Sequence, residues 1–163
     1  MLTIRTATAD DAGLVLDFIR ALAEYERQSQ AVEVTEAVLR EQLAASVPPF
    51  ECLLAQLDAE PAGFALFFHN YSTWRGKRGI WLEDLFVLPA QRRQGVGGAL
   101  LQRVAAIALE RDCARFEWSV LDWNEPAIAF YHSFGTQLLP EWILCRVSDT
   151  ALQQLAHAGV RRG

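Results

Sequence analysis

The most informative segment of the chain, from Leu82 to Val104, reads LEDLFVLPAQRRQGVGGALLQRV. An apolar strand leads through a loop with three glycines directly into a helix, whose apolar stripe begins at Leu100. Glycines let the backbone turn so that successive N–H groups converge, and the positive end of the helix lies directly behind them. The loop therefore predicts a pyrophosphate site, where Arg92 or Arg93 can hold a further phosphate in a bidentate contact.

Three known anion-binding patterns can be compared with this loop. A P-loop needs Gly-Lys-Ser/Thr at the start of the helix, and this chain has Gly97-Gly98-Ala99 there. A dinucleotide fingerprint needs a small residue where this chain has Leu100, which weakens that interpretation. The third pattern is the spacing Arg92-x-x-Gly95-x-Gly97, which resembles the acyl-coenzyme A loop of the GNAT acetyltransferases. A plain glycine turn carrying two solvated arginines remains open as the structural alternative.

Outward from this loop, apolar patterning predicts alternating helices and strands. Strands are expected over 2–6, 52–57, 63–68, 79–88, 115–121 and 142–147, and helices after Asp10 or Asp11 and over 35–45, 98–111, 124–134 and 150–157. There is no linker, internal repeat or low-complexity stretch. The sequence thus predicts one domain over residues 1–163, of the α/β (α+β) class. Its mixed, mostly antiparallel sheet should have about six to seven strands, with helices on both faces.

Composition excludes several classes of protein. The chain has 163 residues, of which 52% are hydrophobic and 21% charged, so it is not a disordered chain. A net charge of −5 argues against nucleic-acid binding and suits a cationic partner. Three widely spaced cysteines form neither a disulfide framework nor a zinc pair, and no apolar run reaches about 18 residues. We therefore expect a cytoplasmic protein with no membrane contact and no metal.

A second informative segment lies at the predicted helix 124–134. Asn124 suits the N-cap of this helix, and Pro126 suits its first turn, where the missing N–H does no harm. Both residues therefore have a structural explanation. Tyr131 lies seven residues beyond Asn124, nearly two helical turns, so the helix entry and the phenol share one face. A phenol facing a cleft can protonate a departing thiolate. The alternative is an aromatic core residue beside Phe130 and Phe134, which the helix considered without the glycine loop favours.

Taken together, several segments resemble the GNAT acetyltransferases, and within them the diamine and thialysine N-epsilon-acetyltransferase branch. The matching segments are Tyr71-Ser72-Thr73-Trp74, Leu82-Glu83-Asp84-Leu85, the loop 92–97, Leu121-Asp122-Trp123-Asn124 and Tyr25-Glu26. The resemblance implies transfer of an acetyl group from acetyl-CoA, by direct attack, to the primary amine of a small molecule such as a diamine, polyamine or lysine-like amino acid. It also implies a homodimer.

The resemblance also implies the residues that hold the cofactor. They are Leu85, Phe86 and Val87 on the strand, Arg92, Arg93, Gln94, Gly95, Val96, Gly97 and Gly98 in the loop, and Asn124. By similarity, the backbone N–H of Val87 polarises the acetyl carbonyl. Tyr131 is implied to protonate the coenzyme A thiolate.

On the amine side, the resemblance assigns substrate contacts to Tyr25, Glu26, Trp74 and Glu83. The carboxylates expected near the amine are Glu26, Glu83 and Asp84. A lysine-like amine with a pKa of about 10.4 costs roughly 4.6 kcal/mol to deprotonate at pH 7, which gives Glu83 a role as base through a water molecule. Glu83 and its neighbour Asp84 are expected on opposite faces of their strand, so only one can readily reach the site. Pairing with an arginine is then the alternative for Asp84.

Two other functions remain to be weighed against this enzyme. One is a non-catalytic acyl-CoA-binding module, and the other is an acetyltransferase acting on the amine of a protein. Tyr131 and Glu83 favour catalysis, since both side chains retain the atoms that proton transfer needs. The Tyr71–Trp74 turn and the nearby acidic residues favour a closed pocket over an open protein-binding groove.

Overall fold

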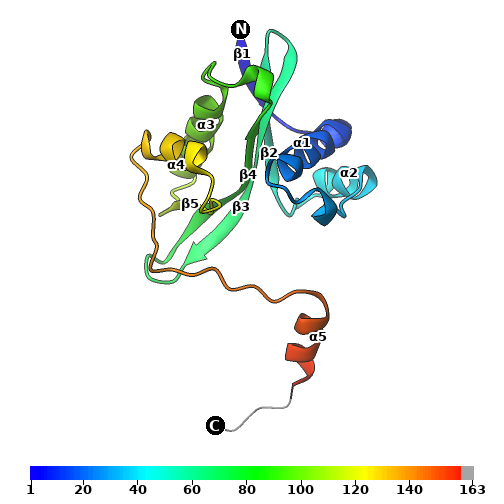
Figure 1. Cartoon of the computed structure of the whole chain (residues 1–163), viewed down its shortest axis with the longest axis vertical. Coiled ribbons are helices and arrows are strands. Elements are labelled where there is room, and N and C mark those ends of the chain that lie inside the picture. The colour runs from blue at the N-terminus through cyan, green and yellow to red at the C-terminus, as the bar shows by residue number, and fades with distance from the viewer. Residues whose placement is uncertain (159–163) are drawn as a thin grey trace. The chain divides into compact units, whose positions relative to one another are not determined.

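The computed structural model describes residues 1–158, which belong to two compact units, Met1–Ser119 and the part of the chain from Val120 onward. The first unit contains the sheet and three helices (Figure 1). The second unit contains two short helices and the segment between them. The prediction of a single domain over 1–163 thus stays a prediction, and residues 159–163 lie outside the described part.

One mixed sheet of five strands forms the centre of the first unit. The strands are β1 (Leu2–Thr6), β2 (Glu51–Leu57), β3 (Glu60–Ser72), β4 (Lys77–Val87) and β5 (Phe116–Trp118). They lie in the order of the sequence; β1 to β4 are antiparallel neighbours, and β5 runs parallel to β4. The predicted class, a mixed and mostly antiparallel sheet, is confirmed, although the strand count of six to seven was too high for the described residues.

Helices cover both faces of this sheet, as predicted. α1 (Ala12–Tyr25) and α2 (Glu36–Ala44) lie on one face, and α3 (Val96–Glu110) lies on the other (Figure 1). The α1 face is closed by a core in which the rings of Phe18 and Phe64 stack with centroids 5.4 Å apart. Cys52 is buried in the same core, and burial raises the pKa of its thiol to about 12, as expected for a packed interior cysteine.

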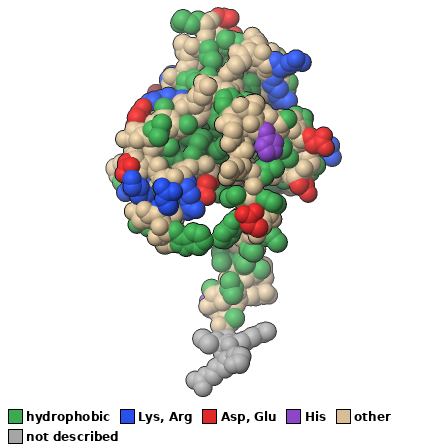
Figure 2. Space-filling model, turned by 90° about the vertical axis from the view of Figure 1, so that its left-hand side faces the viewer, with side chains coloured by type: hydrophobic (Ala, Val, Ile, Leu, Met, Phe, Trp, Pro, Cys, Tyr) green, Lys and Arg blue, Asp and Glu red, His purple; other side chains and the backbone are tan. Residues whose placement is uncertain are grey.

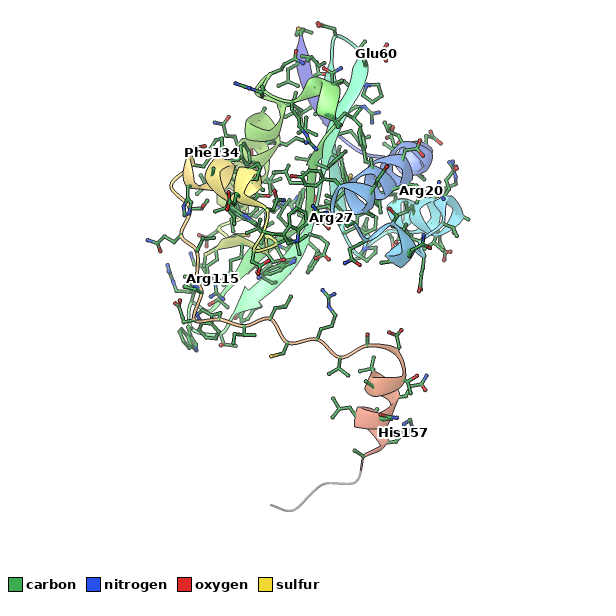
Figure 3. All side chains as sticks on the ribbon, in the orientation of Figure 1. Arg20, Arg27, Glu60, Arg115, Phe134 and His157 are labelled. Atoms are coloured by element: carbon green, nitrogen blue, oxygen red, sulfur yellow. The ribbon has the colours of Figure 1, made fainter. Side chains whose placement is uncertain are left out.

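The end of α1 positions two of the predicted substrate residues, Tyr25 and Glu26. The Gln28 N–H donates to the Ala23 carbonyl at 2.7 Å, and the Arg27 N–H donates to the Glu24 carbonyl at 3.0 Å. Arg27 has φ +60°, so the two bonds form a Schellman motif with a left-handed residue just beyond the helix. Figure 3 labels Arg27 where the chain leaves α1 beside the sheet.

The second unit carries α4 (Glu125–His132) and α5 (Asp149–His157). The Asn124 side chain caps α4 by accepting from the Ala127 N–H at 3.3 Å, and Gly135 ends the following turn with φ +75°. The predicted strand 142–147 was wrong, because these residues form no strand in the described part of the chain. A strand needs a neighbouring backbone to pair with, and the described part of this unit contains no other strand.

None of the helices within residues 1–158 has the length and apolar character needed to cross a lipid bilayer.

Candidate active site

The glycine loop joins β4 to α3 as predicted. Beyond β4 the chain makes a short 3₁₀ helix, Pro89–Gln91, and Gly95 then occupies the N-cap of α3 with φ +81°. A Cβ atom at Gly95 would meet nothing within 4 Å, so glycine is favoured there by the left-handed backbone and not by crowding. The first N–H groups of α3 have no acceptor within the helix, so the loop presents donors and the positive helix end together.

The outer edge of β4 is open next to this loop. β5 pairs only with Ile80, Trp81 and Leu82, so the edge of β4 beyond Leu82 has no neighbouring strand in this unit. The Leu88 N–H donates to the Ala62 carbonyl of β3 at 2.9 Å, so the Leu88 N–H points toward β3. Because backbone groups alternate in direction along an antiparallel strand, those of Leu85 and Val87 point away from β3 to the open edge. The Val87 N–H, predicted to polarise the acetyl carbonyl, lies on this edge.

Arg92 turns toward β4 and α1. Its Nε donates to the Val87 carbonyl at 3.0 Å. The guanidinium carbon lies 4.8 Å from the centroid of the Tyr25 ring and 5.6 Å from that of the Phe86 ring. Arg93 has φ +61°, and within residues 1–158 its side chain makes no hydrogen bond or ion pair. The phosphate-binding role of both arginines stays a prediction, and the structure gives Arg92 additional contacts.

The Gln94 side chain makes hydrogen bonds within the loop region. Its Nε2 donates to the Ala90 carbonyl at 3.3 Å and to the Gln91 Oε1 at 3.2 Å. The side chain therefore ties the loop to the preceding 3₁₀ helix, which leaves the backbone N–H of Gln94 as its predicted contact with a phosphate.

A β-bulge places two neighbouring carboxylates on one face of the sheet. Leu66 pairs with Asp84 and Phe67 pairs with Leu82, so Glu83 is one extra residue in β4. Leu66 and Phe67 point to opposite faces, and their partners Asp84 and Leu82 therefore do so too. Glu83 lies on the face opposite Leu82, where its Oε2 accepts from Trp81 Nε1 at 2.9 Å. Asp84 lies on the same face, two residues before Phe86, which packs in the α1 core.

The prediction that Glu83 and Asp84 point to opposite faces was thus wrong, since it assumed regular alternation. The alternative of an arginine partner for Asp84 was also wrong, because Asp84 makes no ion pair within residues 1–158. Burial, together with the negative charges of Glu83 and Glu26, raises the pKa of Asp84 to about 7. Burial also raises the pKa of Glu26. The structure thus brings together the three carboxylates predicted near the amine.

Trp74 lies far along the sheet from the carboxylates of Glu26, Glu83 and Asp84. It lies in the turn after Ser72, the last β3 residue paired with β4, and its side chain is prominently exposed, at 85%. Asp84 pairs with Leu66, six residues earlier on β3, which corresponds to a separation of about 20 Å along the strand. The substrate-binding role of Trp74 therefore stays a prediction, without support from proximity to Glu26 or Asp84.

Asn124 and Tyr131 both belong to the second unit. Asn124 is buried, with 6% of its surface exposed, at the N-cap of α4. Tyr131 is half-buried near the other end of α4, with its ring 5.3 Å from that of Phe130. The helix and the spacing of seven residues are as predicted, while the chemical roles of these two side chains remain predictions.

Comparisons with known proteins test the resemblance. The family model of the acetyltransferase (GNAT) family matches residues 16–136. The chain is 38% identical to the thialysine N-epsilon-acetyltransferase of Bos taurus, over 94% of this chain and 96% of that protein. It is 45% identical to an L-ornithine N5-acetyltransferase of Arabidopsis thaliana, over 60% of this chain and 43% of that protein.

The fold has solved counterparts as well. The structure of an integron cassette protein from the mobile metagenome of V. cholerae superposes with a TM-score of 0.81 at 23% identity, covering 96% of this chain and 98% of that one. That likeness concerns the fold alone. Both named relatives are acetyltransferases, which favours an enzyme over a non-catalytic acyl-CoA-binding module. The predicted resemblance is confirmed, and the chain is an acetyltransferase that belongs to the GNAT family.

Proposed function

We propose that this acetyltransferase moves the acetyl group of acetyl-CoA to the primary amine of a small molecule, either a diamine or polyamine or a lysine-like amino acid, by direct attack. The observation that carries the proposal is the bulge in β4, which sets Glu83 and Asp84 side by side on the face where Glu26 also lies. Three carboxylates attract a cationic amine. The two named relatives act on thialysine and ornithine, in keeping with such a substrate.

The open edge of β4 and the loop fit the cofactor. The backbone groups of Leu85 and Val87 can pair with the amide groups of the pantetheine arm, and the N–H groups of the loop can bind its pyrophosphate. Phe86 lies between those two residues, with its side chain in the core. The Val87 N–H then donates to the thioester carbonyl as negative charge develops on that oxygen, the kind of stabilisation that contributes most in acyl transfer. Asn124 is proposed as a further contact.

A matched pair of glycine variants tests the loop. Gly95 and Gly76 both have positive φ, +81° and +61°, and a Cβ at either would meet nothing within 4 Å. Alanine should lower the free energy of unfolding by about 1–2 kcal/mol at both positions. Only Gly95→Ala should raise the KM for acetyl-CoA, by about tenfold, since one distorted phosphate contact is worth about 1.4 kcal/mol. Urea unfolding and steady-state kinetics measure both effects, and equal KM values in the two variants would contradict the cofactor role.

The carboxylates act on the amine before attack. Asp84 and Glu26 bind the cationic form. Loss of a proton from this amine costs roughly 4.6 kcal/mol at pH 7, and Glu83 accepts that proton through a water molecule. Glu83 suits this role because it is exposed while one of its oxygens is already held by Trp81. The free amine then attacks the carbonyl carbon, a C–N bond forms and the C–S bond breaks. The thiolate receives a proton from Tyr131, and the proton that the nitrogen loses on becoming an amide balances this transfer and restores the phenol through solvent.

A thiol-release assay with acetyl-CoA and a panel of amines tests the function. We expect turnover with small diamines or lysine-like amino acids and none with a lysine-containing protein. No turnover with any amine, despite tight binding of acetyl-CoA, would exclude the proposed reaction. A preference for a protein amine would support the alternative acceptor.

The variant Tyr131→Phe tests whether Tyr131 is the general acid that protonates the thiolate. We expect kcat to fall about tenfold at pH 7, a modest loss because a thiol with a pKa of about 8.5 already leaves readily as its anion. The loss should shrink as the pH rises above the pKa of the thiol. A variant as fast as the wild type over the whole pH range would show that Tyr131 is not the acid.

The proposal includes a homodimeric, cytoplasmic protein with one domain over residues 1–163. The segment after α4 carries exposed apolar side chains that a second copy could cover, among them Trp142, Ile143 and Leu144, which are 67%, 85% and 66% exposed (Figure 2). The three cysteines are free, in keeping with a reducing compartment. Sedimentation velocity would test the dimer, since a monomeric mass at micromolar concentration contradicts it.

A further inference from the structure

Arg92 links three parts of the first unit. Its backbone begins the glycine loop, its Nε donates to the Val87 carbonyl on the open edge of β4, and its guanidinium lies against the Tyr25 ring at the end of α1. The Phe86 ring is the second aromatic contact, at 5.6 Å. Arg92 thus contacts residues on the cofactor side and on the amine side of the candidate site.

The position of α1 relative to β4 matters for the amine. Tyr25 is the last residue of α1, and Glu26 follows it directly. Glu26 lies close enough to Asp84 for its charge to raise the pKa of that carboxyl. A shift of the helix end would therefore change the spacing of the carboxylates that are proposed to bind the amine. The Schellman motif fixes the helix end to its own helix, whereas Arg92 connects that end to β4.

The geometry of these contacts requires an arginine. A guanidinium donates in its plane, here from Nε to a carbonyl, while its faces remain available to aromatic rings. A lysine would keep the positive charge that attracts a phosphate, but it has no Nε donor at this distance from the backbone and no flat face. Charge and shape can therefore be separated by substitution.

We propose that Arg92 is a positioning residue for the amine, which holds Tyr25 and Glu26 at the end of α1 against the acyl-binding edge of β4. The inference rests on the proposed function, and it assigns Arg92 a role beyond the predicted phosphate contact. Neighbouring Arg93 makes no such contacts within the described residues, and it serves as the comparison for loss of charge in the loop.

The experiment compares Arg92→Lys with Arg93→Gln in the full-length protein. For Arg92→Lys we expect kcat/KM for thialysine to fall about tenfold, because misplaced reactants lose rate steeply with distance. The KM for acetyl-CoA should change less than about twofold, since the charge is kept. Arg93→Gln should show the opposite pattern, with a raised KM for acetyl-CoA and an unchanged KM for thialysine.

A second measurement does not depend on turnover. The chain has three tyrosines, so incorporation of 3-fluorotyrosine gives three ¹⁹F resonances, and Tyr25→Phe identifies that of Tyr25. Arg92→Lys should move the Tyr25 resonance in the free protein, whereas Arg93→Gln should leave it in place. The double variant Arg92→Lys/Tyr25→Leu should be no slower with thialysine than Tyr25→Leu alone, because Arg92 acts through Tyr25.

The outcomes are distinct. An unmoved Tyr25 resonance in Arg92→Lys overturns the inference, whether or not the wild type acetylates any amine. Additive losses in the double variant also overturn it. Absence of turnover in the wild type, together with a moved resonance, counts against the proposed function and leaves the contact of Arg92 with Tyr25 supported.

Discussion

Glu83→Gln should lower kcat/KM for the amine about 100-fold at pH 7, since a positioned general base contributes at least about that factor. The amide keeps the size of the side chain and can still accept from Trp81 Nε1, the partner of Glu83 at 2.9 Å, but it cannot take a proton. The deficit should shrink toward pH 10, where an amine with a pKa of about 10.4 supplies its own free base. The measurement is kcat/KM for the amine from pH 6 to pH 10.

Trp81→Phe is the matched control for this variant. It removes the hydrogen bond to Glu83 and leaves the carboxylate in place, so we expect a loss of less than about fivefold with an unchanged pH profile. If Glu83→Gln were impaired equally at pH 7 and pH 10, Glu83 would contribute to binding or position and not to proton transfer.

Asp84→Asn should stabilise the fold above neutral pH. The pKa of this carboxyl is raised from 3.8 to about 7 in the folded protein, so between those values the native state holds a proton that the unfolded chain releases. The free energy of unfolding therefore falls as the pH rises from about 4 to about 7. A shift of about three pKa units corresponds to about 4 kcal/mol, which sets the upper bound.

The amide resembles the protonated carboxyl, so the variant should be about 2–4 kcal/mol more stable than the wild type at pH 8 and nearly equal to it at pH 4. Urea unfolding from pH 4 to pH 8.5 measures the difference. Asp17→Asn, at an exposed position of α1, should change stability by less than about 0.5 kcal/mol throughout. A destabilised Asp84→Asn protein at pH 8 would contradict the burial argument. The KM for the amine should rise in this variant, because a carboxylate has been lost.

Much of the fold follows from patterns that are local in the sequence. Thr35 predicts the start of α2, and the structure shows its side chain accepting from the Val38 N–H at 3.4 Å. The glycine loop between Leu88 and Val96 was located correctly, because glycine conformations and helix starts depend on a few neighbouring residues.

The parts that could not be predicted depend on partners distant in the sequence. The bulge at Glu83 is defined by which β3 residue faces which β4 residue, and LEDL by itself reads as regular alternation. The contacts of Arg92 with Tyr25 cross 67 positions of sequence, and no motif indicates them. The apolar run 142–147 has the composition of a strand, but a strand also requires an adjacent backbone with an open edge.

The bulge in β4 has a consequence for how new substrates can be acquired. Because of the extra residue, Leu82 and Leu85 stay on the face that α3 covers, while Glu83 and Asp84 both face away from it. Glu83 and Asp84 are proposed to face the amine, so mutations at these two positions should alter which molecules are accepted while the packing beneath α3 is untouched. A scaffold of this kind separates the residues under selection for specificity from those under selection for folding, so that one set can diversify at little cost to the other.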